Sequence, residues 1–175
     1  MKDIKNSNID ANKLLYVFIF IGIIPLLVIL GVYLHNTESN ALSNIATRTI
    51  NLPAITSSHN PLMTKVMDVY CKSAPLFALF LFLLSLKKRK ITKTLHRGTL
   101  IKSCILSPLA YLFFIYFFYF QNIELTTAGR PVRLMSSNDI TLLLFYISLY
   151  LSFFFLTYGI LYIPIIAYKL FKGRR

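Results

Sequence analysis

Charge, cysteine, glycine and tryptophan are all scarce in this sequence, and each scarcity excludes a class of protein. Only 14% of the 175 residues are charged and six are acidic, whereas soluble domains carry about 25% charged residues. Two cysteines are too few for a disulfide framework or a cysteine metal site. The six glycines form neither a GxGxxG nor a Walker loop, and no GxSxG elbow occurs. Enzymes of those kinds are excluded, and no catalytic site is expected.

What the sequence does contain is apolar residues and positive charge in separate places. Apolar residues make up 56% of the chain, the mean hydropathy is +0.63, and the net charge is +13. Nucleic-acid binders of similar charge have a polar surface rich in charges, but here the charges are confined to short segments between apolar blocks. We therefore expect a chain dissolved in lipid, with no nucleic-acid partner and no small-molecule substrate.

Four apolar blocks have the length that a membrane requires. Crossing a hydrocarbon core of about 30 Å takes about 20 residues of helix, and the blocks cover residues 14–34, 67–86, 103–120 and 140–168. The fold class predicted is an all-α integral membrane protein, a four-helix transmembrane bundle. The remaining segments are a tail, three loops and a second tail, at residues 1–13, 35–66, 87–102, 121–139 and 169–175.

The basic residues predict the orientation of this bundle, because cytoplasmic flanks of membrane spans carry the excess of Lys and Arg. The two tails and the loop at 87–102 together hold 14 of the 19 basic residues, and the loops at 35–66 and 121–139, with Asp68 beside the first of them, hold four of the six acidic ones. We expect both termini and the middle loop in the cytoplasm, with the other two loops outside. Within the first outer loop, a set of apolar residues has the spacing of a short surface helix: Leu42, Ile45, Ala46, Ile50 and Leu52.

Few polar groups lie inside the blocks, and each has two interpretations. Asp68 and Lys72 stand four residues apart on one predicted helix face, either as an ion pair that anchors the helix end or as part of a partner-facing surface. The small residues Ala78, Ser148 and Ser152 allow close helix approach, either within the bundle or to another protein. Mid-span tyrosines mark a packing or a recognition face in the same way; they are Tyr146, Tyr150 and Tyr158.

Metal and cofactor sites are not expected. The three histidines lack the close spacing of a metal-ligand pair, and His96 falls on the opposite membrane side from His35 and His59. Cys71 and Cys104 are assigned to opposite membrane sides, too far apart for a disulfide, and are interpreted as small buried apolar residues.

Two outer-loop segments carry a family resemblance. Residues 51–72 read NLPAITSSHNPLMTKVMDVYCK, and residues 124–135 read ELTTAGRPVRLM, followed by Asn138, Asp139 and LLLFYISLY. These segments resemble the immunity proteins that protect bacteria against pore-forming colicins of the colicin A type. The resemblance extends over all four blocks, although the tails and the interiors of the first and third blocks match only in apolar character.

The resemblance implies a plasmid-encoded protein of the bacterial inner membrane with four spans and cytoplasmic termini. It implies bacteriocin immunity, in which the protein binds the pore-forming domain of a cognate colicin in the membrane and prevents channel opening. A small transporter or channel subunit, or an assembly factor for a membrane complex, is the alternative. The candidate partner-binding residues are Asp68, Lys72, Ala78, Glu124, Thr126, Thr127, Arg130, Arg133, Asp139, Ser148 and Ser152.

Overall fold

The computed structural model describes residues 2–86, 88–89 and 97–172. Several of the basic residues used to predict the orientation lie outside the described residues, as does His96; these basic residues are Lys87, Lys90, Lys93, Arg174 and Arg175. Four helical stretches in the described chain are long and apolar enough to cross a membrane: Asn8–His35, Pro61–Ser85, Ile101–Phe120 and Asp139–Lys169.

The spans are formed by five helices, because the second span is broken. They are α1 (Lys2–His35), α3 (Pro61–Cys71) with α4 (Ala74–Ser85), α5 (Arg97–Phe120) and α7 (Asp139–Lys172). The helix of the second span begins at Pro61, six residues before the expected residue 67, since proline is well suited to the first turn of a helix. Its first turns carry the polar side chains that hold the outer loops.

The break in the second span lies at Lys72 and Ser73, just before Pro75, which cannot donate a backbone hydrogen bond to the preceding turn. Side chains satisfy the carbonyls that the break exposes. The Ser73 hydroxyl donates to the Tyr70 carbonyl at 2.7 Å, and the Tyr119 hydroxyl of α5 donates to the Lys72 carbonyl at 2.6 Å. The break therefore ties α5 to the second span.

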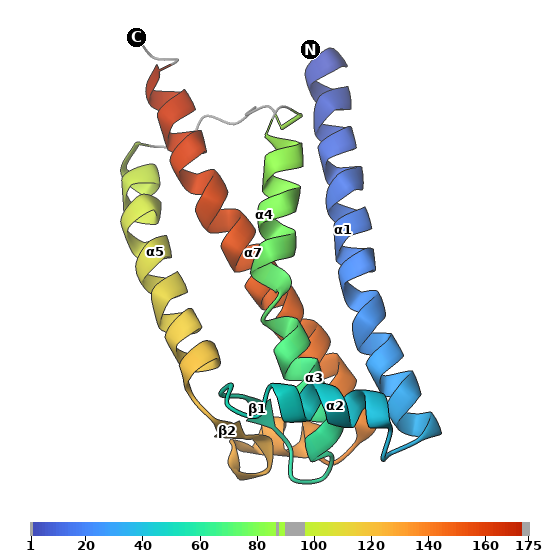
Figure 1. The fold of residues 1–175 in the computed structure, drawn as a ribbon. Coiled ribbons are helices and arrows are strands. Elements are labelled where there is room, and N and C mark those ends of the chain that lie inside the picture. Colours follow the sequence, from blue (N-terminus) through green and yellow to red (C-terminus); the bar gives the residue numbers. More distant parts are fainter. Residues whose placement is uncertain (1, 87, 90–96, 173–175) are drawn as a thin grey trace.

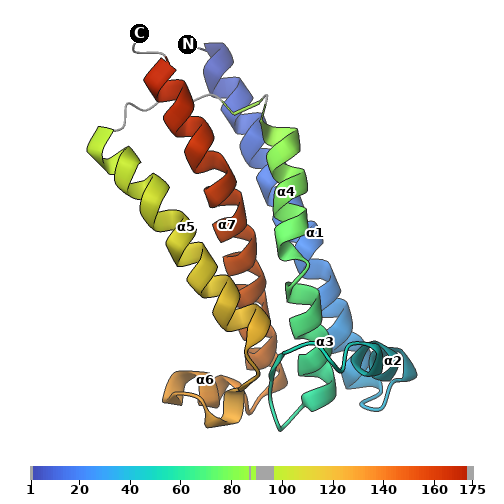
Figure 2. The same ribbon diagram turned by 60° about the vertical axis from the view of Figure 1, so that its left-hand side comes forward.

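The spans run side by side, with the short elements gathered at one end (Figure 1). The start of α1 and the end of α7 lie at the opposite end, together with the end of α4 and the start of α5 (Figures 1 and 2). α7 crosses the bundle obliquely and contacts α1, α3, α4 and α5, whereas α5 packs mainly on α7. α7 is thus the common neighbour of the other spans.

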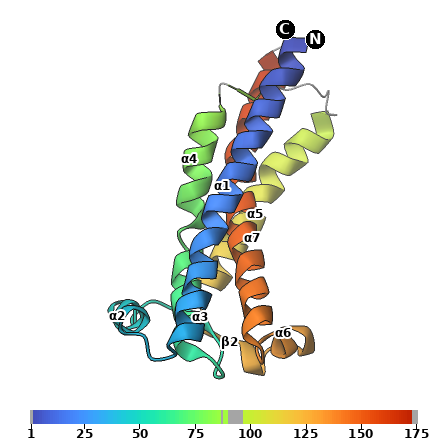
Figure 3. The ribbon, with the colours of Figure 1, turned by 90° about the vertical axis from the view of Figure 1, so that its right-hand side faces the viewer.

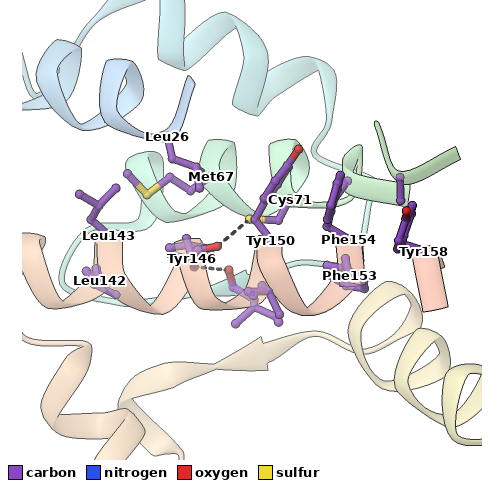
Figure 4. Packing of buried hydrophobic residues seen from close by; sticks show 14 of the residues in the cluster. Leu26, Met67, Cys71, Leu142, Leu143, Tyr146, Tyr150, Phe153, Phe154 and Tyr158 are labelled. Carbon is purple, nitrogen blue, oxygen red and sulfur yellow. Dashed lines mark hydrogen bonds between the residues drawn. The ribbon is translucent and has the colours of Figure 1, made fainter. Parts of the chain in front are cut away.

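The packing face of α7 is a ladder of large side chains spaced four residues apart (Figure 4). All of its members are at most 7% exposed; they are Leu142, Tyr146, Tyr150, Phe154, Tyr158 and Tyr162. Side chains four residues apart lie above one another on a helix, so the ladder presents one continuous ridge to the other helices. The mid-span tyrosines are therefore helix-packing residues.

Glycine allows α1 to approach this ladder closely at Gly22. A Cβ at that position would overlap the Tyr150 hydroxyl. The Tyr70 ring stacks on the Tyr150 ring with 5.6 Å between centroids, and the Tyr70 hydroxyl donates to the Gly22 carbonyl at 2.7 Å. This contact joins the first, second and fourth spans near the middle of the bundle.

Short elements close the loop end of the bundle. They are α2 (Asn40–Arg48), β1 (Ile55–Thr56), β2 (Ile123–Glu124), the 3-10 turn η1 (Leu125–Thr127) and α6 (Arg130–Met135). The predicted surface helix is confirmed as α2, which buries Leu42 and packs on α3. It ends before Ile50 and Leu52.

Candidate functional site

The two loops at this end form one unit, which we call the loop cap (residues 36–60 and 121–138). β1 and β2 pair in parallel, with Ile55 opposite Ile123 and Thr56 opposite Glu124. The Ile123 N–H donates to the Ala54 carbonyl at 3.1 Å. The pairing joins segments 68 residues apart in sequence, with the second and third spans between them, so it forms only when these spans bring the two loops to the same end.

Glu124 fastens the two loops together. Its carboxylate accepts the Ser58 N–H at 2.8 Å and the Thr126 hydroxyl at 2.9 Å. Burial alone would raise the pKa of the Glu124 carboxyl, but these donors, with the Thr126 N–H, outweigh burial and lower the pKa below its ordinary value. The ionised carboxylate therefore stabilises the cap.

The Asp68 and Lys72 side chains form an ion pair, with 2.8 Å between Lys72 Nζ and Asp68 Oδ2. The Asp68 side chain is 1% exposed and that of Lys72 is 11% exposed. Lys72 Nζ also donates to the Pro53 carbonyl and lies 5.8 Å from the centre of the Tyr119 ring. The pair holds the cap on the second span and offers almost no surface to another molecule.

Further contacts attach the cap to the ends of the spans. The Tyr146 hydroxyl of α7 donates to the Ile55 carbonyl at 2.7 Å, within the packing shown in Figure 4. The Asn60 amide donates to the carboxylate of Asp139, the first residue of α7. Asp139 thus joins the base of the fourth span to the first loop.

The surface of the cap has a hollow of about 380 Å³ beside the paired strands. Its lining combines a cation from α3 with an anion and an amide from the second loop: Ala54, Thr56, Lys65, Asn122, Ile123 and Glu124. Thr127, Arg130 and Arg133 are exposed elsewhere on the cap, and Thr126 is half-buried against Glu124. Of the sequence candidates, these cap residues, Asp139 and the buried Asp68–Lys72 pair lie at one end of the bundle.

The small residues of the spans separate into two environments. Ala78 is fully buried among the residues that pack on α7, so no partner can contact it in this structure. Ser148 and Ser152 are exposed on α7, and their hydroxyls donate to carbonyls of their own helix at 2.8 Å. Only the serine pair lies on a surface that another helix in the membrane could approach.

A polar cluster at the opposite end was not predicted. The Ser85 hydroxyl lies 2.7 Å from the Tyr162 hydroxyl and 3.2 Å from that of Tyr158. The Arg89 guanidinium donates to Tyr158 at 3.0 Å and to Asn12 of α1 at 3.4 Å. Tyr158 and Tyr162 are four residues apart, and this spacing could have indicated that they lie on one face of the helix. Nothing in the sequence shows that Arg89 reaches them.

Within the described residues, no three His, Cys, Asp or Glu side chains gather in a way that could hold a metal ion. Cys71 and Cys104 are both free thiols. The polar contacts described above for the cap connect the two loops to each other and to the ends of the spans. The fold and its cap therefore define a small helical membrane protein with four candidate spans joined by a hydrogen-bonded loop cap.

The chain belongs to the colicin immunity protein family, whose model matches residues 38–175. It is 56% identical to the colicin-A immunity protein of Citrobacter freundii over 172 residues, which cover 98% of this chain and 97% of that protein. It is 42% identical to the colicin-B immunity protein of Escherichia coli over 171 residues, 98% of each chain. No solved structure matches it. Its role is bacteriocin immunity, and proteins of this family are inhibitory binding proteins.

Proposed function

We propose that this protein binds the pore-forming domain of an incoming colicin of the colicin A type in the inner membrane and prevents channel opening. The observation that carries the proposal is the identity of 56% to the colicin-A immunity protein along nearly the whole of both chains. The four apolar spans support it, because helices of this length and composition can cross the bilayer in which such a channel would open.

The inhibition requires no chemical step. A protein that binds only a state preceding the open channel shifts the toxin population toward that state. Reducing an open fraction from 99% to 1% takes about 5.5 kcal/mol of preference for the closed state. A few well-packed helix contacts in lipid are of that order in total.

We propose that the loop cap faces the periplasm and that both termini are cytoplasmic. The basic residues of the tails and of residues 87–102 support this, since the described ends of those segments lie together, away from the cap (Figure 1). Alkaline phosphatase should be inactive when fused after Arg175 and active when fused after Ser58. The reverse pattern would contradict this orientation.

The recognition surface that we propose combines the exposed serine face of α7 with the polar hollow of the cap. Helices in lipid recognise one another through small residues that allow close approach and through a few polar contacts, because lipid provides little hydrophobic drive. Ser148 and Ser152 supply the first kind of contact. Lys65 of the hollow supplies a charge at the end from which a toxin would arrive.

The experiment is a killing assay in sensitive bacteria that express the protein at matched levels. The wild-type chain should protect against colicin A or a near relative and leave nuclease colicins lethal. Protection from no pore-forming colicin, with normal membrane accumulation, would refute the proposed function. A transporter would instead produce solute flux in vesicles without protecting cells.

The recognition surface is tested separately with a matched pair of variants. Ser148→Phe should abolish or strongly reduce protection, whereas Val28→Phe, which adds the same ring at an exposed position of α1, should retain it. Equal protection by the two variants would exclude the serine face and leave the immunity function intact. Ala78→Phe is unsuitable because Ala78 lies in the core and its replacement would disturb the fold.

A further inference from the structure

We propose that α2 and α6 lie in the headgroup region of the outer leaflet, with their exposed aliphatic side chains in lipid and their arginines beside lipid phosphates. The ligand class is the phospholipid interface itself. This inference is independent of toxin binding, because it concerns how the cap sits on the membrane in the absence of any partner.

The first observation is the position of the two helices. Both run across the ends of the spans and project to opposite sides of the bundle (Figures 2 and 3). Residues 36–39 separate α1 from α2, and residues 136–138 separate α6 from α7. Linkers of four and three residues reach at most about 14 Å, so each helix must remain near the membrane end of the span beside it.

The second observation is the exposed apolar surface. Ile45 of α2 is 43% exposed, Ile50 just after it 71%, and Leu134 of α6 74%. α2 already packs on α3 through the buried Leu42, so these side chains are not the face that holds the helix to the bundle. Exposed aliphatic groups mark contact with a membrane or another protein when they are part of a larger apolar surface.

The third observation is continuity with the lipid-facing surface of the spans. Leu34 in the last turn of α1 is 62% exposed, and Ile140 in the first turn of α7 is 63% exposed. Each lies a few residues from one of the two short helices. The apolar surface therefore continues from the spans onto the cap, as expected for helices that lie along the boundary between headgroups and acyl chains.

The charges of the two helices fit phosphate. α2 ends with Arg48, α6 contains Arg130 and Arg133, and neither helix contains an acidic residue. Arginine forms bidentate hydrogen bonds with phosphate, and basic side chains above apolar ones are typical of interfacial helices.

Geometry favours lipid over a protein partner as the occupant. Because α2 and α6 project to opposite sides of the bundle, a single protein would have to surround the bundle to cover both. A bilayer surrounds a membrane protein on every side.

The sequence contains no tryptophan, so single-tryptophan variants of the full chain provide an unambiguous fluorescence probe. Ile45→Trp and Leu134→Trp report on the two helices, and Ile50→Trp serves as a second reporter beside α2. His59→Trp is the matched control, since His59 is exposed in the loop between β1 and α3, which extends farther from the spans than α2 (Figure 1). Protection from colicin killing identifies the variants that fold.

Each variant is reconstituted without toxin into phosphatidylcholine vesicles, some brominated on the acyl chains near the headgroup. Tryptophan at 45, 50 and 134 should emit at shorter wavelength than at 59, should be quenched by the brominated lipid, and should be several-fold less quenched by iodide. Equal iodide quenching at all positions without quenching by brominated lipid would overturn the proposal. Shielding from iodide that appears only when a colicin pore-forming domain is added would also overturn it, and would assign this surface to a protein partner.

Discussion

Gly22→Ala tests whether the contact between α1 and the tyrosine ladder determines the stability of the bundle. The added methyl group would overlap the Tyr150 hydroxyl, and overpacking of this kind costs about 1–3 kcal/mol. Replacing glycine in a helix returns up to about 1 kcal/mol. The free energy of unfolding should therefore fall by about 1–2 kcal/mol, which lowers the ratio of folded to unfolded protein by a factor of about 5 to 30.

Gly31→Ala is the matched control, because Gly31 lies in the same helix and a Cβ there would have no neighbour within 4 Å. This variant should be as stable as the wild-type protein or slightly more stable. Unfolding in mixed micelles by increasing fractions of a denaturing detergent, followed by circular dichroism, provides the comparison. Combining Gly22→Ala with Tyr150→Phe, which removes the closest atom, should restore part of the lost stability.

The reasoning fails if Gly22→Ala is as stable as Gly31→Ala. α1 would then lie against the ladder with enough freedom to move away at no cost. If the loss of stability in Gly22→Ala is unchanged by adding Tyr150→Phe, the strain lies elsewhere on α1.

Two further predictions concern the cap. Lys72→Met should reduce the amount of folded protein in the membrane, because it leaves Asp68 buried without its partner at a cost of about 3–5 kcal/mol. The double variant with Asp68→Asn should recover most of the lost folded protein. Membrane accumulation and unfolding measurements test both expectations. The pKa of Glu124 is lower in the folded protein than its ordinary value of 4.5. The contribution of its carboxylate to the free energy of unfolding is therefore complete above pH 4.5 and is lost as the pH falls through the lowered pKa. The stability difference between wild-type protein and Glu124→Gln should therefore shrink below pH 4.5 in unfolding measurements; a difference that stays constant or grows there would contradict the role of the carboxylate in holding the loops.

The helices could be predicted from the sequence because hydropathy and helix length report directly on a membrane. The Asp68–Lys72 pair could also be predicted, since residues four apart on a helix are neighbours. Its burial could not, because the segment around Pro53 that covers it comes from a loop.

Other features depend on contacts that leave no local pattern. Strands of two residues show no alternation that would identify them, and their partners are 68 residues apart. Ala78 and Ser148 have the same kind of spacing to a small neighbour, yet one lies in the core and the other faces outward. Which face of a uniformly apolar helix packs inward depends on the other helices, and the sequence of one span does not contain that information.

The position of α7 has a consequence for the order in which this protein is made. Ribosomes deliver the spans from the N-terminus onward, so α7, which contacts the other spans, enters the membrane after them. Until then α5 lacks the helix on which it mainly packs, and Tyr146 and Asp139 are not present to hold the first loop. A nascent chain that stops before residue 139 therefore contains three spans without their common neighbour, and such chains should be readily removed by membrane proteases. We therefore expect protection to require that α7 of each molecule has been inserted.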